Sequence, residues 1–294
     1  MKKNLLFINR ILWAGASLAL VLVSQSCTDE KVKPGPTPLP TPVAETNAEA
    51  RDYAAYTELA WSDEFDGGSL DESKWTREQG GGGWGNNELQ TYTNSNENAF
   101  LTGGDLVIEA KQASGTNQYT SARLITKGKK DFQFGRIDVR AKLPKGRGIW
   151  PAIWMLGSNI DQVNWPVCGE IDIMEMKGSQ PNQVLSTMHY ANSMGNREYK
   201  SNQWQTLAEG TYADDYHLYS MVRSKDLIRT YIDGREVFSF SPGNASPNPF
   251  NNPFFMILNV AVGGNFDGNP NGSTVFPQQM RVDYVRFYQY KDTK

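Results

Sequence analysis

Strict alternation of apolar and charged residues marks several stretches of the chain as β-strands. In residues 136–143 every odd-numbered residue is apolar and every even-numbered residue is charged, which predicts a strand with one buried face. Asp233-Gly234 precedes residues 235–238 and is typical of a hairpin turn. Similar patterns predict further strands, at residues 106–111, 229–232 and 282–288.

Long loops punctuate these strands, and little helical periodicity is present. Stretches rich in Gly and Asn occur at residues 80–87 and 263–272, and there is no internal repeat. Repeated short strands with such punctuation predict a single all-β domain, an antiparallel β-sandwich of the jelly-roll type, from about residue 56 to residue 290.

The composition indicates which classes of binding partner suit the chain. The chain has 29 basic and 32 acidic residues, so it offers no basic footprint for nucleic acid. It also has 8 Trp, 13 Tyr and 13 Phe, which suit a large core and flat platforms for stacking on sugars.

The first 50 residues indicate export. Lys2, Lys3 and Arg10 precede an apolar run at residues 11–23, which is too short to span a bilayer comfortably. Cys27 follows small residues and resembles the cleavage site of a bacterial lipoprotein, although Ser24 departs from that pattern.

We therefore expect a lipoprotein signal peptide at residues 1–26, a lipidated Cys27 and a Pro-rich tether up to residue 50. The protein would be anchored in the cell envelope, in the outer membrane, and the sequence leaves open whether it is exposed at the surface. The alternative is an ordinary secreted protein that is cleaved nearby. Lipidation of Cys27 would leave Cys168 without a partner, so no intrachain disulfide is expected.

Three carboxylates lie within six positions of one predicted strand: Glu170, Asp172 and Glu175. Glu170 and Asp172 share a face, whereas Glu175 reaches that face only if a β-bulge at Ile173-Met174 adds one residue. One interpretation is the solvated face of a half-buried strand. The other is the carboxyl pair of a retaining glycosidase. The local pattern leaves both open.

Several motifs together resemble glycoside hydrolase family sixteen, and within it the laminarinases, which are endo-β-1,3-glucanases. They are Trp-Ser-Asp-Glu-Phe-Asp (61–66), Asn-Asn-Glu-Leu-Gln (86–90), Phe-Gly-Arg (134–136), Gly-Ile-Trp-Pro-Ala-Ile-Trp-Met-Leu (148–156), Gly-Glu-Ile-Asp-Ile-Met-Glu (169–175), Leu-Asn-Val-Ala-Val-Gly-Gly-Asn (258–265) and Asp-Tyr-Val-Arg-Phe-Tyr (283–288). The resemblance implies a catalytic domain at residues 51–294, with the substrate cleft on the concave face of a jelly roll.

The resemblance also implies roles for the acids. Glu170 would be the nucleophile, Glu175 the general acid/base, and Asp172 a neighbour that orients Glu170. The expected activity is retaining endo-hydrolysis of β-1,3-containing glucans, either laminarin or mixed-linkage β-1,3/1,4-glucan, by a monomer. The extra residue Met174 is similar to that of laminarinases, although relatives with it also cut galactans such as agar.

The resemblance implies seven positions at or beside the substrate: Asn87, Glu88, Arg123, Trp150, Trp154, Trp165 and His189. Trp84 lies in a Gly-rich loop, so we expect it to be exposed and to contact the substrate as well. For each Trp, core packing is the alternative. Arg123 could be an ion-pair partner and His189 a satisfied core residue. His217 matches a structural position of the family.

The resemblance implies no catalytic cofactor, and the chain has no His-x-x-x-His pair for zinc. It implies a structural calcium held by Glu64, the Gly104 carbonyl and Asp283, with a simply hydrogen-bonded Asp283 as the alternative. Val222-Arg223 stands where relatives usually have Glu-Trp, which affects packing there. Two rival functions share these features: a non-catalytic glycan-binding lipoprotein and a transglycosylase.

Overall fold

The computed structural model describes residues 46–115, 118–243, 245 and 247–291, which belong to one compact unit within Leu39–Lys294. Cys27 and the predicted signal peptide lie outside the described residues, as does most of the predicted tether. In the described part of the chain, no helix is long and apolar enough to cross a membrane.

The described strands form two sheets. The first has ten strands: β16 (Arg235–Phe240), β15 (Leu227–Ile232), β14 (His217–Ser224), β8 (Gly135–Lys142), β18 (Gln278–Tyr290), β5 (Asp105–Gln112), β6 (Tyr119–Ser121) and β3 (Gln90–Tyr92) in order, with β1 (Tyr56–Asp63) beside β18 and β4 (Ala99–Thr102) beside β5. The second has eight: β12 (Arg197–Ser201), β11 (Gln183–Ala191), β10 (Glu170–Glu175), β9 (Ile149–Gly157), β17 (Phe254–Val262), β7 (Arg123–Ile125) and β2 (Thr76–Glu78), with β13 (Gln205–Thr206) beside β11.

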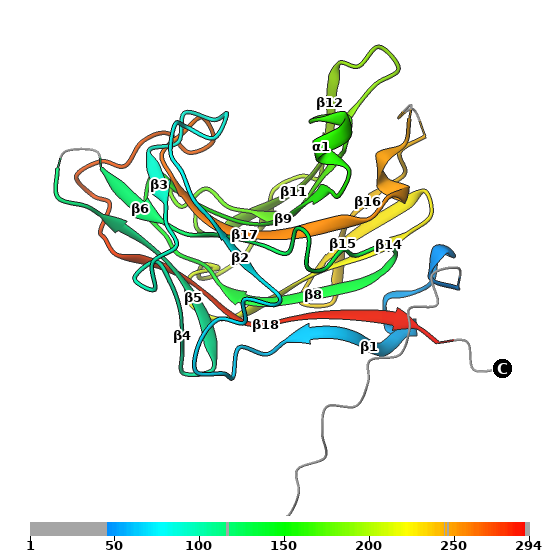
Figure 1. Cartoon of the computed structure of the whole chain (residues 1–294), viewed down its shortest axis with the longest axis horizontal. Helices are drawn as coiled ribbons and strands as arrows, with labels where there is room; N and C mark the ends of the chain where they lie inside the picture. The colour runs from blue at the N-terminus through cyan, green and yellow to red at the C-terminus, as the bar shows by residue number, and fades with distance from the viewer. Residues whose placement is uncertain (1–45, 116–117, 244, 246, 292–294) are drawn as a thin grey trace, which may run out of the picture. The chain divides into compact units, whose positions relative to one another are not determined.

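The sheets stack as the predicted antiparallel sandwich, which is confirmed. Among the described strands, the one parallel pair is β3 with β6. Short helical turns are confined to connections: η1 (Thr46–Ala48), η2 (Tyr53–Ala55), α1 (Ile160–Val163) and η3 (Pro249–Asn251). In Figure 1 the strands β9, β11 and β17 dip between two raised ends, one near β3 and the other at β12 and α1. The eight-stranded sheet is therefore concave on the side facing away from the other sheet.

The core lies between the sheets and is built from the inward faces of alternating strands. The residues predicted as strand 136–143 coincide with β8, whose odd-numbered residues are buried. The predicted hairpin also forms, with φ of 51° at Asp233 and 78° at Gly234. The core includes Ile108, Ile137, Val139 and Met221 from one sheet and Ile153, Met155, Ile171, Met188, Met256 and Leu258 from the other.

The predicted tether ends earlier than residue 50. Asn47 is buried, and its side-chain oxygen accepts a hydrogen bond of 2.6 Å from the backbone N–H of Tyr290. Tyr53 donates to Asp138 at 3.3 Å and covers part of the outer face of β8. This segment therefore packs on the ten-stranded sheet, which explains why Asp138 is buried although the alternation predicted an exposed position.

Val222 and Arg223, where the chain departs from the family pattern, are both buried. The Arg223 guanidinium donates hydrogen bonds to three backbone carbonyls, those of Phe132 at 2.5 Å, Asn252 at 3.0 Å and Phe250 at 3.3 Å. Burial lowers the pKa of Arg223 to about 9, so the group stays protonated at neutral pH. A buried cation thus ties β14 to the loops before β8 and β17.

Replacing this cation is expected to destabilise the fold. Arg223→Ala would remove the side-chain donor to the Phe250 and Asn252 carbonyls and one of two donors to the Phe132 carbonyl, and it would open a cavity. We therefore expect the free energy of unfolding to fall by about 3–5 kcal/mol. Denaturant unfolding measures it, with Arg235→Ala, at an exposed position, as the control. A loss below about 1 kcal/mol, as for an ordinary surface site, would contradict the tethering role.

Candidate active site

The three acids of β10 lie on one face of the concave sheet because the strand carries a bulge. Asp172 is paired with Trp154 and Glu175 with Ala152, so three steps along β10 match two steps along β9. The partners Trp154 and Ala152 are two residues apart and share a face. Asp172 and Glu175 therefore share that face too, and the predicted bulge at residues 173–174 is confirmed.

The opposite face of β10 anchors the acids in the core. Ile171, Ile173 and Met174 are all buried in the main hydrophobic cluster. Gly169 immediately precedes β10 and has φ of 80°, and a Cβ there would lie 2.8 Å from a side-chain carbon of Pro249. Only glycine fits this close approach in the left-handed region. The apolar residues and the glycine together hold the acidic face outward.

His189 on β11 stands opposite Glu170 in the register. Its Nε2 atom lies 3.6 Å from Glu170 Oε1 and 3.3 Å from Asp172 Oδ2. One potential ligand atom of each of these three side chains lies within 4.8 Å of the others, and this is the one such group of metal-capable side chains in the described ranges. His189 thus belongs to the acidic cluster, and its contact with the substrate stays a prediction.

Burial is the main cause that raises the pKa of all three carboxyls. It raises the pKa of Glu170 to about 8, with help from the charge of Asp172, and the pKa of Asp172 to about 8, against the charge of Arg197. The pKa of Glu175 lies well above its usual range, because burial is joined by repulsion from both other acids. Burial and the two neighbouring acids therefore favour the protonated form of Glu175.

The raised pKa of Glu170 predicts a stability that depends on pH. From its ordinary value of 4.5 the pKa rises to about 8 on folding, so the folded state binds more protons between these values, and stability falls as pH rises through that window. Glu170→Gln should therefore stabilise the fold by about 4 kcal/mol at pH 8 and hardly at pH 4.

Thermal unfolding across pH 4–8 tests this expectation. Glu97→Gln, at an exposed position, is the matched control and should show no such trend. An equal gain for Glu170→Gln at both ends of the range would show that packing rather than protonation sets the effect.

Trp150 links the acids to an aromatic cluster that the sequence did not single out. Its Nε1 donates a hydrogen bond of 3.1 Å to Glu175 Oε1, and its ring stacks on Phe266 at 4.8 Å. Trp204 lies 6.1 Å from Phe266, and Lys177 Nζ lies 5.1 Å from the Phe266 ring. The available signal for Phe266 was an aromatic residue inside a Gly- and Asn-rich loop.

Arg123 is held between two tryptophans. Its Cζ atom lies 4.7 Å from the ring centres of both Trp84 and Trp154, and its Nε lies 2.5 Å from Glu78 Oε2. The ion pair that was the alternative interpretation is therefore present. The structure brings Trp84, Arg123 and Trp154 together, and contact of Arg123 with sugar hydroxyls stays a prediction.

Trp154 begins a chain of polar contacts towards the loop at residues 80–88. Its Nε1 donates to Asn259 Oδ1 at 2.6 Å, and Asn259 donates to the Tyr92 hydroxyl at 2.9 Å. Tyr92 in turn donates to Glu88 at 3.4 Å, which also accepts a hydrogen bond of 2.6 Å from Gln90. Burial raises the pKa of Glu88. The predicted site residues Trp154 and Glu88 are thus joined through their neighbours.

Two further predicted residues are exposed. Asn87 is exposed, has φ of 57° and donates to Asn265 Oδ1 at 2.9 Å, which ties two loops together. Trp165 is 43% exposed, and its ring lies 6.3 Å from that of His189. An exposed tryptophan beside the acids is available for stacking, so core packing does not account for Trp165.

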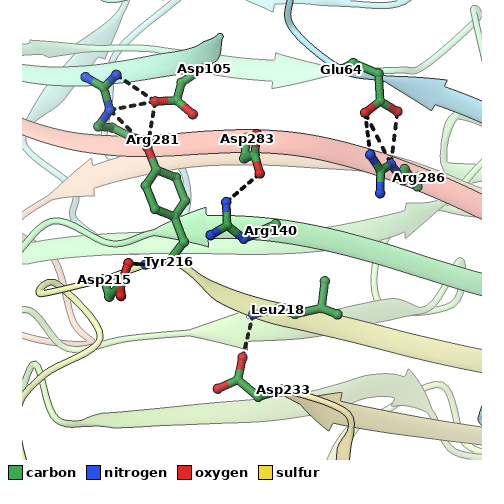
Figure 2. A network of polar contacts seen from close by, with 10 residues as sticks. All are labelled: Glu64, Asp105, Arg140, Asp215, Tyr216, Leu218, Asp233, Arg281, Asp283 and Arg286. Carbon is green, nitrogen blue, oxygen red and sulfur yellow. Dashed lines mark hydrogen bonds and ion pairs between the residues drawn. The ribbon is translucent and has the colours of Figure 1, made fainter. Parts of the chain in front are cut away.

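The two predicted carboxylate ligands of calcium, Glu64 and Asp283, form ion pairs with arginines. Glu64 forms a two-pronged ion pair with Arg286, and Asp283 accepts a bond of 2.5 Å from Arg140, as Figure 2 shows. Gly104 lies in the turn between β4 and β5. This arrangement does not fit a calcium ion unless both arginines move aside. Calcium stays a prediction, which an unchanged melting temperature in a chelator would dismiss.

The remaining chemically active side chains lie apart from the acids or inside the core. His217 Nδ1 lies 2.7 Å from Asp233 Oδ2, at the hairpin of the other sheet. Cys168 is a buried free thiol, and burial raises its pKa to about 11, which suits packing rather than reactivity. The predicted absence of a disulfide involves Cys27, which lies outside the described residues.

Comparisons with known proteins agree with this geometry. Residues 86–286 match the model of glycosyl hydrolases family 16, and the chain belongs to this family. It is 41% identical to glucan endo-1,3-beta-glucosidase A1 of Niallia circulans over 79% of this chain, although it spans only 38% of that protein's length. It is also 41% identical to a beta-glucanase of Rhodothermus marinus, over 81% of this chain and 87% of that protein.

The fold likeness extends to solved structures. The laminarinase catalytic domain of Thermotoga maritima superposes with a TM-score of 0.72 at 44% identity, over 80% of this chain and 99% of that domain. The all-β jelly roll predicted from the sequence is therefore that of the family.

Proposed function

We propose that this chain is a retaining endo-β-glucanase that hydrolyses internal bonds of β-1,3-containing glucans, laminarin and mixed-linkage β-1,3/1,4-glucan among them. Family membership, together with the likeness to three glucan-cutting proteins of the same fold, supports this substrate class. The observation that carries the proposal is the bulge that places Glu170, Asp172 and Glu175 on one face.

The surroundings of Glu175 support a division of labour. Burial and repulsion from the two other acids raise the pKa of the Glu175 carboxyl well above its usual range, so it can hold a proton for the departing sugar oxygen. Trp150 donates to Glu175 Oε1 and orients that carboxyl. Glu170 shares the face and would attack the anomeric carbon once ionised.

The cycle follows from these positions. Glu175 protonates the glycosidic oxygen while the Glu170 carboxylate forms a bond to the anomeric carbon, which gives a glycosyl ester with inverted configuration. The departure of the first sugar leaves Glu175 ionised. It then takes a proton from water, whose oxygen displaces Glu170 and restores the original configuration.

Asp172 is placed to couple the two steps. It lies between the outer acids in sequence, it is buried, and its charge raises the pKa of both Glu170 and Glu175. When Glu170 is consumed in the ester, one negative charge disappears from the cluster. The pKa of Glu175 then falls, which favours its second role as a base.

Product analysis tests the proposed substrate class. Purified protein is incubated with laminarin, mixed-linkage β-glucan and agarose, and new reducing ends and the anomer released first are followed. We expect oligosaccharides from the two glucans with retained configuration. Cleavage of agarose alone would place the chain with galactan-cutting relatives, and an inverted first product is incompatible with the cycle above.

The same assay separates the rival functions. A glycan-binding lipoprotein would retain laminarin without producing new reducing ends. A transglycosylase would lengthen some chains, because sugar rather than water would attack the intermediate.

We also propose that Cys27 carries lipid and anchors the protein in the outer membrane. Support comes from the sequence alone: the apolar run at residues 11–23 ends shortly before a cysteine that follows small residues. Labelling with a radioactive fatty acid in a Gram-negative host should mark the full chain and not Cys27→Ala. Equal labelling of both would exclude this anchor.

A further inference from the structure

We propose that Arg197 is a positioning residue that fixes the tautomer of His189, so that the imidazole presents its N–H to the buried oxygen of Asp172. The inference extends the proposed glycosidase function and depends on it only for its catalytic consequence. Arg197 begins the edge strand β12, and Arg197 Nη2 lies 3.1 Å from His189 Nδ1.

The direction of the proton follows from the chemistry of the two partners. A guanidinium can only donate, so Nδ1 of His189 must accept. A neutral imidazole with an accepting Nδ1 carries its proton on Nε2, which is the atom 3.3 Å from Asp172 Oδ2. That oxygen is buried and accepts no hydrogen bond from the described residues in the structure, although His189 Nε2 lies 3.3 Å away. An Nε2–H group is therefore a donor within reach of an acceptor that needs one.

Aromatic rings hold the arginine in place. The Arg197 guanidinium lies 5.5 Å from the ring of Trp165 and 5.2 Å from that of Tyr199. The His189 ring lies between the same two residues, at 6.3 Å and 5.8 Å. The side chains of Arg197 and His189 thus both contact the rings of Trp165 and Tyr199, which limits the rotation of both side chains.

The charges around His189 come from two strands. Glu170, Asp172 and Glu175 face it from β10, and Arg197 faces it from β12. Burial and the positive charge of Arg197 lower the pKa of His189, while Glu170 and Glu175 act in the opposite direction. Arg197 also lowers the pKa of Asp172. Removing this cation should therefore raise the pKa of both neighbours.

Nitrogen NMR of the imidazoles tests the proposal directly. The chain has two His, so the spectrum of ¹⁵N-histidine-labelled full-length protein is simple. His217 serves as an internal reference, because Nδ1 must carry its proton to reach the Asp233 carboxylate. We expect His189 to show the opposite tautomer, protonated on Nε2, from about pH 6 to 8.

Arg197→Met keeps an apolar stem between Trp165 and Tyr199 but removes the donor and the charge. We expect mixed tautomers of His189 and a rise of its pKa by about one unit. Arg197→Lys should restore most of the wild-type spectrum, since lysine also donates. Lys200→Met, an exposed position on the same strand, is the matched control and should change neither quantity.

Kinetic measurements then test whether the contact between Arg197 and His189 affects catalysis. On laminarin, the acid limb of kcat/KM for Arg197→Met should move to higher pH, while the melting temperature stays near that of Lys200→Met. An unchanged His189 tautomer and pKa in folded Arg197→Met would overturn the proposal, whatever the activity. If the wild-type protein shows the expected His189 tautomer but does not cleave glucan, the proposed function would be overturned. The positioning of His189 by Arg197 would still hold.

Discussion

Glu170→Ala should reduce kcat/KM on laminarin by about 10⁴-fold or more, because the proposed cycle needs the Glu170 carboxylate to form the bond to the anomeric carbon. That loss corresponds to about 5.5 kcal/mol of transition-state stabilisation. Initial rates of reducing-end release measure it. Since the side chain is only partly exposed and costs stability when ionised, the variant should remain folded at neutral pH.

Added azide identifies the role of Glu170. With an aryl β-glucoside oligomer as substrate, azide can occupy the space left by the carboxylate and attack from the same side. We expect an α-glycosyl azide and partial recovery of rate. Glu97→Gln should behave as wild type, and near-normal turnover of Glu170→Ala without azide would eliminate the assignment.

Glu175→Gln should affect poor and good leaving groups very differently. A glucan needs its departing oxygen protonated, so kcat/KM on laminarin should fall by about 10³-fold. An aryl glycoside with an acidic phenol leaves without that proton, and its first step should remain fast. The glycosyl ester should then accumulate, because the general base for water is also missing.

The stereochemistry of azide rescue separates Glu175 from Glu170. Azide needs no general base, and in Glu175→Gln it attacks the ester from the face opposite Glu170. The expected product is a β-glycosyl azide, the opposite anomer from that of Glu170→Ala. Mass spectrometry should detect the ester on intact protein before azide is added. Equal rate losses on both substrate types would contradict the acid/base role.

The outer face of the ten-stranded sheet shows where local pattern stops being informative. The even-numbered residues of β8 are charged and were predicted to face solvent. Side chains of other strands instead supply partners, such as Asp283 of β18 for Arg140, and Arg281 contacts Asp105 and Tyr216 nearby in Figure 2. The calcium site was predicted from the family resemblance, and that prediction did not include these ion pairs. The paired residues lie far apart in the sequence, so local pattern does not reveal them.

The sequence by itself determined the sandwich, the strand that carries the acids and the bulge within it. All three follow from local spacing: alternation sets which side chains are buried, and one extra residue between Asp172 and Glu175 turns the second to the face of the first. These properties depend on backbone geometry over a few residues, so they can be predicted from the sequence.

Only the tertiary structure decided what surrounds the acids. Three contacts join segments that are separate along the chain or lie on different strands. They are Phe266 against Trp150, Arg123 against two tryptophans, and Arg197 against His189. Such contacts depend on how loops pack and on which strands become neighbours, and neither is encoded in local periodicity. The same non-local packing buries the carboxyls, and burial is what raises their pKa values.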